Sequence, residues 1–98
     1  MNYILYDVMS IIRDVNVITG FQIRAARFAL RLSADELARA SGVSLPTIQR
    51  FEQHDGVPPS RSSKLLDVQS ALEAAGIEFL GTPDDGPGIR LRRKPPGA

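Results

Sequence analysis

The chain has 98 residues and a hydrophobic fraction of 43%, enough for one small domain with a modest core. Its 12 lysines and arginines balance 11 aspartates and glutamates, so no overall basic field indicates nucleic acid, and any DNA-binding face must depend on locally placed arginines. The absence of cysteine excludes a disulfide framework and a thiolate metal site, and it agrees with a cytoplasmic location.

Residues 1–20 form an apolar N-terminal extension. Asp7 and Asp14 interrupt it, and no basic region precedes it, so we expect neither a signal peptide nor a membrane span. Because the extension has many β-branched residues, a strand around Val15 to Thr19 is an alternative to a helix. The extension must be covered either by its own domain or by a dimer contact. The helix is the interpretation favoured by the spacing of the apolar residues in the extension, which are Ile4, Leu5, Val8, Ile11, Ile12 and Val15.

A first helix is expected from Phe21 onward, and two short helices joined by a glycine turn follow between Arg31 and Glu52. Ser33 and Glu36 have the spacing of a capping box. Gly42 can end the first short helix with a positive φ. Ser44 can cap the second, which has Pro46 in its first turn. This pattern predicts a helix-turn-helix, which presents the start of its second helix to the DNA major groove.

A fourth helix is predicted from near Ser60 to Gly76. The hydrophobic period then changes, and two short strands are expected around the turn-rich sequence GTPDDGPG. They predict a β-hairpin over residues 77–93, followed by a disordered tail at 94–98. Because an isolated hairpin is marginal in water, it should pack on the helices or pair with a partner subunit.

The stretch from about Phe21 to Gly76 resembles the XRE/Cro-like helix-turn-helix repressors. The resemblance implies a mainly α, lambda-repressor-like four-helix domain over residues 21–76 that binds double-stranded DNA as a homodimer. It also implies an ion pair between Arg27 and Glu52 that orients the reading helix. Ala34 and His54 replace a glutamine and a glycine that are usual in the family. The matching positions are Ile23, Arg24, Arg27, Leu32-Ser33, Glu36-Leu37-Ala38, Gly42-Val43-Ser44, Thr47-Ile48, Phe51-Glu52 and Pro58.

The candidate DNA contacts fall into two groups. Arg50 is the first choice for reading a base, because arginine can bind guanine through two hydrogen bonds, and Gln49 is the second, because glutamine can bind adenine likewise. The full set of candidate base-reading residues is Leu45, Pro46, Thr47, Gln49, Arg50 and Gln53. Donors near helix N-termini are the candidates for phosphate contacts, although capping is the alternative role for the serines. They are Ser33, Ser44, Arg61, Ser62 and Lys64.

A basic cluster closes the hairpin, where it can either contact DNA or protect an edge strand against aggregation. It comprises Arg90, Arg92, Arg93 and Lys94. The single histidine, His54, has no metal-ligand spacing around it, and no glycine-rich phosphate loop follows a strand, so we expect neither an enzyme nor a cofactor or metal.

We therefore expect a sequence-specific DNA-binding regulator, most simply a repressor that occupies its operator as a dimer. Two alternatives stay open. One is an antitoxin-type regulator that also binds a protein partner. The other is a protein-interaction module that has the same fold but does not bind DNA, which the apolar Leu45-Pro46 and the small net charge favour.

Overall fold

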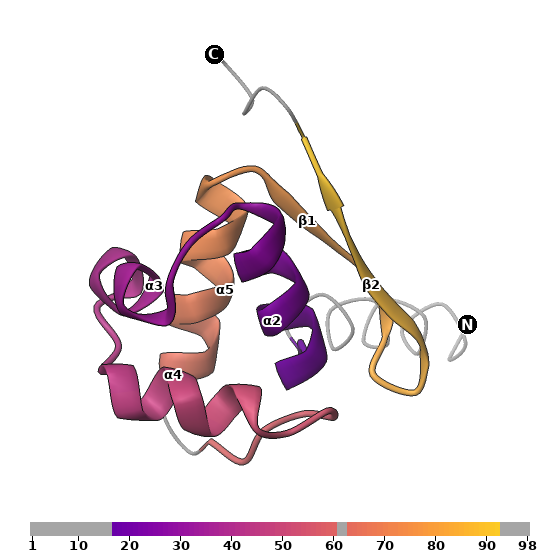
Figure 1. Ribbon diagram of the computed structural model, residues 1–98. Helices are drawn as coiled ribbons and strands as arrows, with labels where there is room; N and C mark the ends of the chain where they lie inside the picture. Colours follow the sequence, from indigo (N-terminus) through magenta and orange to yellow (C-terminus); the bar gives the residue numbers. More distant parts are fainter. Residues whose placement is uncertain (1–16, 61–62, 93–98) are drawn as a thin grey trace, which may run out of the picture.

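The computed structural model describes residues 17–60 and 63–92. The described chain contains helices α2 (Gly20–Ala29), α3 (Ala34–Ser41), α4 (Leu45–Glu52) and α5 (Lys64–Ala74), followed by strands β1 (Ile77–Thr82) and β2 (Asp85–Leu91) (Figure 1). The predicted helix or strand in residues 1–16 and the predicted tail at 94–98 lie outside the described residues.

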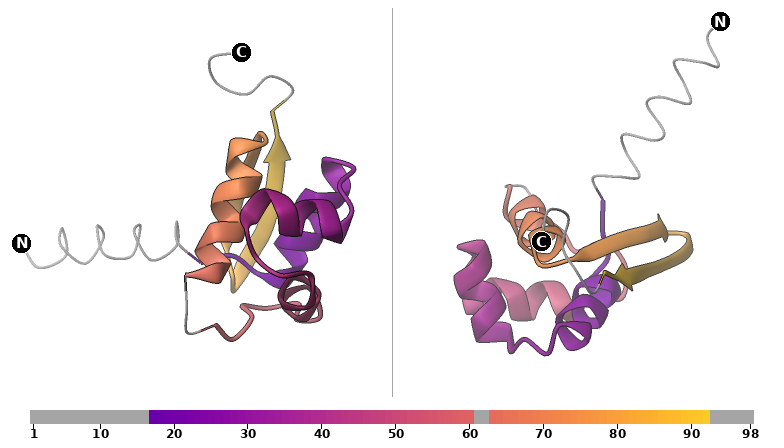
Figure 2. Two further views of the ribbon diagram at one scale, coloured as in Figure 1. Left: turned by 90° about the vertical axis from the view of Figure 1, so that its left-hand side faces the viewer. Right: turned by 90° about the horizontal axis from the view of Figure 1, so that it is seen from above.

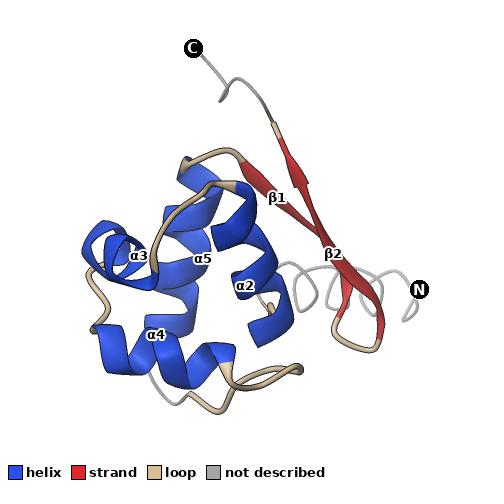
Figure 3. Cartoon of the chain, viewed as in Figure 1, coloured by secondary structure: helices blue, strands red, loops and turns tan. Residues whose placement is uncertain are grey.

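The four helices surround an apolar core to which each of them contributes (Figure 3). The largest fully buried apolar side chains of the helices come from α2, α3, α4 and α5, and α5 packs against both α2 and α3. No helix in the described ranges is long and apolar enough to cross a membrane. The largest fully buried apolar side chains of the four helices are Ile23, Leu37, Ile48, Phe51, Val68 and Leu72.

Side-chain caps fix where three of the helices begin. Ser33 accepts a hydrogen bond from the backbone N–H of Glu36, and the Glu36 carboxylate accepts one from the backbone N–H of Ser33. Ser44 caps α4 through the backbone N–H of Thr47. Thr19 forms a capping box with Gln22 at the start of α2, which the sequence analysis did not predict. The predicted caps are therefore joined by one at a position assigned to the N-terminal extension.

The hairpin is built into the domain through Gln22. This side chain is only 2% exposed, and its amide Nε2 donates to the carbonyl oxygens of Leu80 (3.0 Å) and Gly88 (2.9 Å), one on each strand. Ile77 is buried, and Phe79 and Ile89 pack against the core. One buried amide thus ties the first helix to both strands.

The predicted fold class, a mainly α, lambda-repressor-like four-helix domain with an N-terminal apolar extension and a C-terminal hairpin, is wrong as a whole, although the order of helices followed by a C-terminal hairpin agrees with the structure. The two strands of the hairpin pair with each other as an antiparallel sheet. Side chains of the hairpin also contribute to the core, so the described chain combines helices with a sheet in one packed unit. Residues 18–20, which were assigned to the extension, also belong to the folded unit, because Ile18 and Thr19 are buried and Gly20 begins α2. The four helices do not close the core alone, and the strands complete it.

Two predicted boundaries also shift. α5 begins at Lys64 instead of near Ser60, and its N-cap, Ser63, makes no side-chain cap bond. The strands are longer than expected because Thr82 pairs with Asp85 across a short turn, so residues with turn propensity enter the ladder. The register shifts between Leu80 and Thr82. Figures 1 and 2 show the hairpin turn on the far side of the domain from α3.

Candidate nucleic-acid interface

The site is built on α3, a tight turn and α4. Gly42 ends α3 in the left-handed region with φ 73°, which glycine adopts without steric cost. Val43 is 3% exposed and anchors the turn in the core. Ser44 then caps α4, where Pro46 lies in the first turn and needs no hydrogen-bond acceptor. The two helices pack on each other across this turn.

One face of α4 is buried and the other is open. Ile48 and Phe51 are fully buried, whereas Gln49, Arg50 and Gln53 are exposed. The guanidinium carbon of Arg50 lies 5.7 Å from the centre of the Phe51 ring. Of the six predicted base-reading residues, Pro46 is also exposed and Leu45 is half-buried. The exposed face therefore combines an apolar start with three polar side chains.

Thr47 was predicted among the exposed reading residues, and this is wrong. Its side chain is buried, with 9% of the residue exposed, and its Oγ1 accepts a hydrogen bond of 2.9 Å from Oγ of Ser44. The inward face of α4 is set by Ile48 and Phe51, and Thr47 lies beside them at the capped end of the helix. Thr47 thus belongs to the cap and the core, not to the open face.

Arg27 and Glu52, which the family resemblance paired, do form an ion pair. Nε and Nη2 of Arg27 donate to the two carboxylate oxygens of Glu52, each at 2.8 Å, and Nη1 donates to the carbonyl oxygen of Leu32 at 3.1 Å. Their side chains are 15% and 11% exposed. The hydrogen bonds to Glu52 raise the pKa of Arg27 above its usual value, although burial opposes this. The pair joins α2 to the last residue of α4.

Two further contacts hold the C-terminal end of α4, and the sequence analysis assigned neither a role. Arg24 donates from Nη1 to the carbonyl oxygen of Glu52. The backbone N–H of Gly20 donates to the carbonyl oxygen of Gly56 at 2.9 Å, which ties the start of α2 to the loop after α4. The spacing of Arg24 and Arg27, one turn apart on α2, was the available sequence signal for the first contact.

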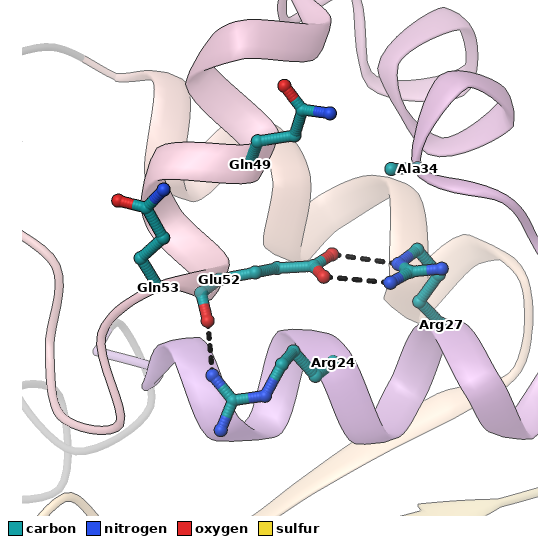
Figure 4. A pocket seen from close by; sticks show the side chains of 6 residues that line it. All are labelled: Arg24, Arg27, Ala34, Gln49, Glu52 and Gln53. Atoms are coloured by element: carbon teal, nitrogen blue, oxygen red, sulfur yellow. Dashed lines mark hydrogen bonds and ion pairs between the residues drawn. The ribbon is translucent and has the colours of Figure 1, made fainter.

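An open hollow separates α2, the first residue of α3 and the exposed face of α4 (Figure 4). We call it the α2–α4 hollow. Figure 4 shows Gln49 and Gln53 projecting from α4 on one side and Arg24 and Arg27 from α2 on the other. The lining is rich in hydrogen-bond donors, because two arginines and two amides contribute to it. Its lining residues are Arg24, Arg27, Ala34, Gln49, Glu52 and Gln53.

Three of the predicted phosphate-contacting residues lie among the described residues, at the starts of three different helices. Ser33 and Ser44 both use their hydroxyl oxygens to cap their own helices. The bonds from Ser33 to Glu36 lower the pKa of the Glu36 carboxyl. Lys64 is exposed at the start of α5, and Arg61 and Ser62 lie outside the described residues.

The described part of the basic cluster, Arg90 and Arg92, lies away from α4. Arg90 and Arg92 both donate to one carboxylate oxygen of Glu78, at 3.1 and 2.9 Å. Arg90 lies near the C-terminal end of β2 and Arg92 directly follows this strand, and in Figure 1 the C-terminal end of β2 and α4 are at opposite ends of the domain. Arg93 and Lys94 are outside the described residues. The two described arginines therefore share an exposed ion-pair network on the hairpin.

Within residues 17–60 and 63–92, no three histidine or acidic side chains come close enough to hold a metal ion. No protein-family model and no curated protein matches the chain.

Proposed function

We propose that the protein binds double-stranded DNA in a sequence-specific manner by placing α4 in the major groove. The observation that carries this proposal is the exposed face of α4, where Gln49, Arg50 and Gln53 project from a helix whose other face is buried and whose C-terminal end is clamped to α2. A major groove admits one α-helix, and a rigidly held helix keeps its side chains in register with the base edges.

Arg50 and Gln49 are the proposed base-reading residues. An arginine can donate two hydrogen bonds to guanine, and a glutamine can pair with adenine through one donor and one acceptor. Leu45 and Pro46, at the start of the helix, offer only apolar contact, for which a thymine methyl is the matching group. We therefore propose that a single copy reads few base pairs. Repression by occupation of an operator, a cytoplasmic location and a relationship to the XRE/Cro-like repressors, without the four-helix fold that the resemblance implied, belong to the same proposal.

A binding titration tests this function. Wild-type protein should bind a duplex selected for high affinity, with an affinity that falls as salt rises. Arg50→Ala should weaken binding to that duplex by about tenfold to hundredfold and reduce the preference over unrelated sequence. Arg90→Ala removes the same charge from the hairpin and should change the affinity far less. Equal losses in the two variants would assign DNA binding to general charge, and no binding to any duplex at low salt would favour the protein-interaction module.

We also propose that a second copy of the chain completes the DNA-binding unit, because one reading helix contacts too few bases for useful specificity. The outward side of α2 carries Phe21 and Phe28, seven residues apart and 45% and 69% exposed, which supports a protein contact there. Sedimentation at about 100 μM, well above a micromolar Kd, should show a dimer. Phe28→Ser should shift it toward monomer more than Val57→Ser, a matched change at another exposed apolar residue. A monomer in the wild type would refute the dimer.

A further inference from the structure

The guanidinium group of Arg24 has two differently occupied edges. Nη1 donates to the carbonyl oxygens of Glu52 and His54, the latter at 3.4 Å, which holds the group against the end of α4. Nη2 donates to Oδ1 of Asp55 at 2.6 Å. The side chain of Arg24 is 30% exposed, whereas that of Asp55 is 91% exposed. One edge is therefore fixed by backbone, and the other is occupied by an acidic side chain that lies almost entirely in solvent.

Arg27 provides the contrast within the same hollow. Each of its three guanidinium nitrogens donates a hydrogen bond, to the Glu52 carboxylate or the Leu32 carbonyl, and its side chain is 15% exposed. The partner of Arg27 is itself well buried, so it cannot leave without stranding a charge. The exposed pair between Arg24 and Asp55 has no such constraint, because ion pairs in water contribute little to stability.

We propose that Asp55 occupies Arg24 in the free protein and is exchanged for a backbone phosphate when DNA binds. This inference rests on the proposed function. Arg24 lines the α2–α4 hollow together with Gln49 and Gln53, so a duplex that contacts the exposed face of α4 also has its backbone near Arg24 (Figure 4). A phosphate oxygen accepts from a guanidinium as a carboxylate does, and both form charge-assisted hydrogen bonds.

The exchange makes Asp55 a residue that sets affinity. Every duplex must displace the carboxylate before Arg24 can bind a phosphate, so Asp55 weakens binding to specific and non-specific sequences alike. Displacement also leaves the Asp55 carboxylate without its cation, near the DNA. Removing the charge of Asp55 should therefore strengthen binding and steepen its dependence on salt.

The test compares Asp55→Asn with Glu73→Gln, which removes the same charge from an exposed residue in the last turn of α5. Figure 1 shows that end of α5 on the side of the domain away from α4. Affinities for one duplex are measured at several salt concentrations. We expect Asp55→Asn to bind about threefold tighter or better. Its plot of log affinity against log salt should be steeper than that of the wild type by about 0.9. Glu73→Gln should leave both quantities nearly unchanged.

Both changes are then repeated in an Arg24→Gln background, whose fold is checked by circular dichroism. The affinity advantage of Asp55→Asn over Glu73→Gln should be smaller there, because only the repulsion between the carboxylate and the DNA is left and no guanidinium has to be released. Wild-type binding with equal effects of the two acidic variants would overturn the exchange and leave the proposed function intact. An affinity advantage of Asp55→Asn that is undiminished without Arg24 would also overturn it. Absence of duplex binding in the wild type would overturn both proposals.

Discussion

Gly20→Ala is expected to destabilise the protein by about 3 kcal/mol. A Cβ atom at this position would lie 1.9 Å from the carbonyl oxygen of His54 and 2.2 Å from that of Phe51. Both obstacles are backbone atoms at the end of α4, so no side chain can move aside to make room. Relief requires that α2 and α4 separate, which disturbs the buried Phe51 and the contact of Gly20 with Gly56.

Chemical denaturation of the purified variants measures this effect, with Gly56→Ala as the control. A Cβ atom at Gly56 would meet nothing within 4 Å, so this variant should stay within about 0.5 kcal/mol of the wild type. The two glycines are joined by one backbone hydrogen bond, and they differ in the space around them. Equal unfolding free energies for the two variants would show that the close approach of α2 to α4 is not as described.

Glu52→Met is expected to cost about 3 kcal/mol, because it leaves the Arg27 guanidinium largely buried without a counter-charge. This cost is at the lower end of the range for breaking a buried ion pair, since the side chains of Arg27 and Glu52 are still 15% and 11% exposed. Arginine cannot escape this cost by losing its proton. The double variant Arg27→Met/Glu52→Met removes both charges and should recover most of the loss.

The same unfolding measurement on Glu78→Met supplies the matched control. Glu78 also accepts from arginine, but its side chain is 35% exposed and its partners Arg90 and Arg92 are more than half exposed. Its replacement should therefore cost less than about 1 kcal/mol. If Glu52→Met is no more destabilising than Glu78→Met, or if the double variant is no better than the single one, the ion pair does not hold α4 in place.

The parts of the structure that could be predicted from the sequence are governed by short-range rules. Ser33, Gly42 and Ser44 determine where helices begin and end through contacts within a few residues, so their patterns are visible in the chain itself. The buried and exposed faces of α4 also follow from helical periodicity. The exception is Thr47, which was expected to be exposed but is buried, with its hydroxyl hydrogen-bonded to the cap residue Ser44.

The parts that could not be predicted depend on partners far apart in the chain. Gln22 bonds to carbonyl oxygens 58 and 66 residues away, and nothing local to Gln22 indicates a β-hairpin. Glycine is required at position 20 because the backbone at the end of α4 leaves no room for a Cβ atom, and not because of a local turn. These two residues set how the elements are joined, because Gln22 links α2 to both strands and Gly20 allows α2 to lie against the end of α4. The Arg27–Glu52 pair was available only through the family resemblance.

Selection of bound sequences from a random duplex pool tests the central claim, that the exposed face of α4 reads DNA. We predict that wild-type protein enriches a defined motif with two related half-sites, and that Arg50→Ala loses the preference at one position in each half-site while it still binds DNA. No enrichment by the wild type, or the same motif at undiminished preference from Arg50→Ala, would contradict the claim.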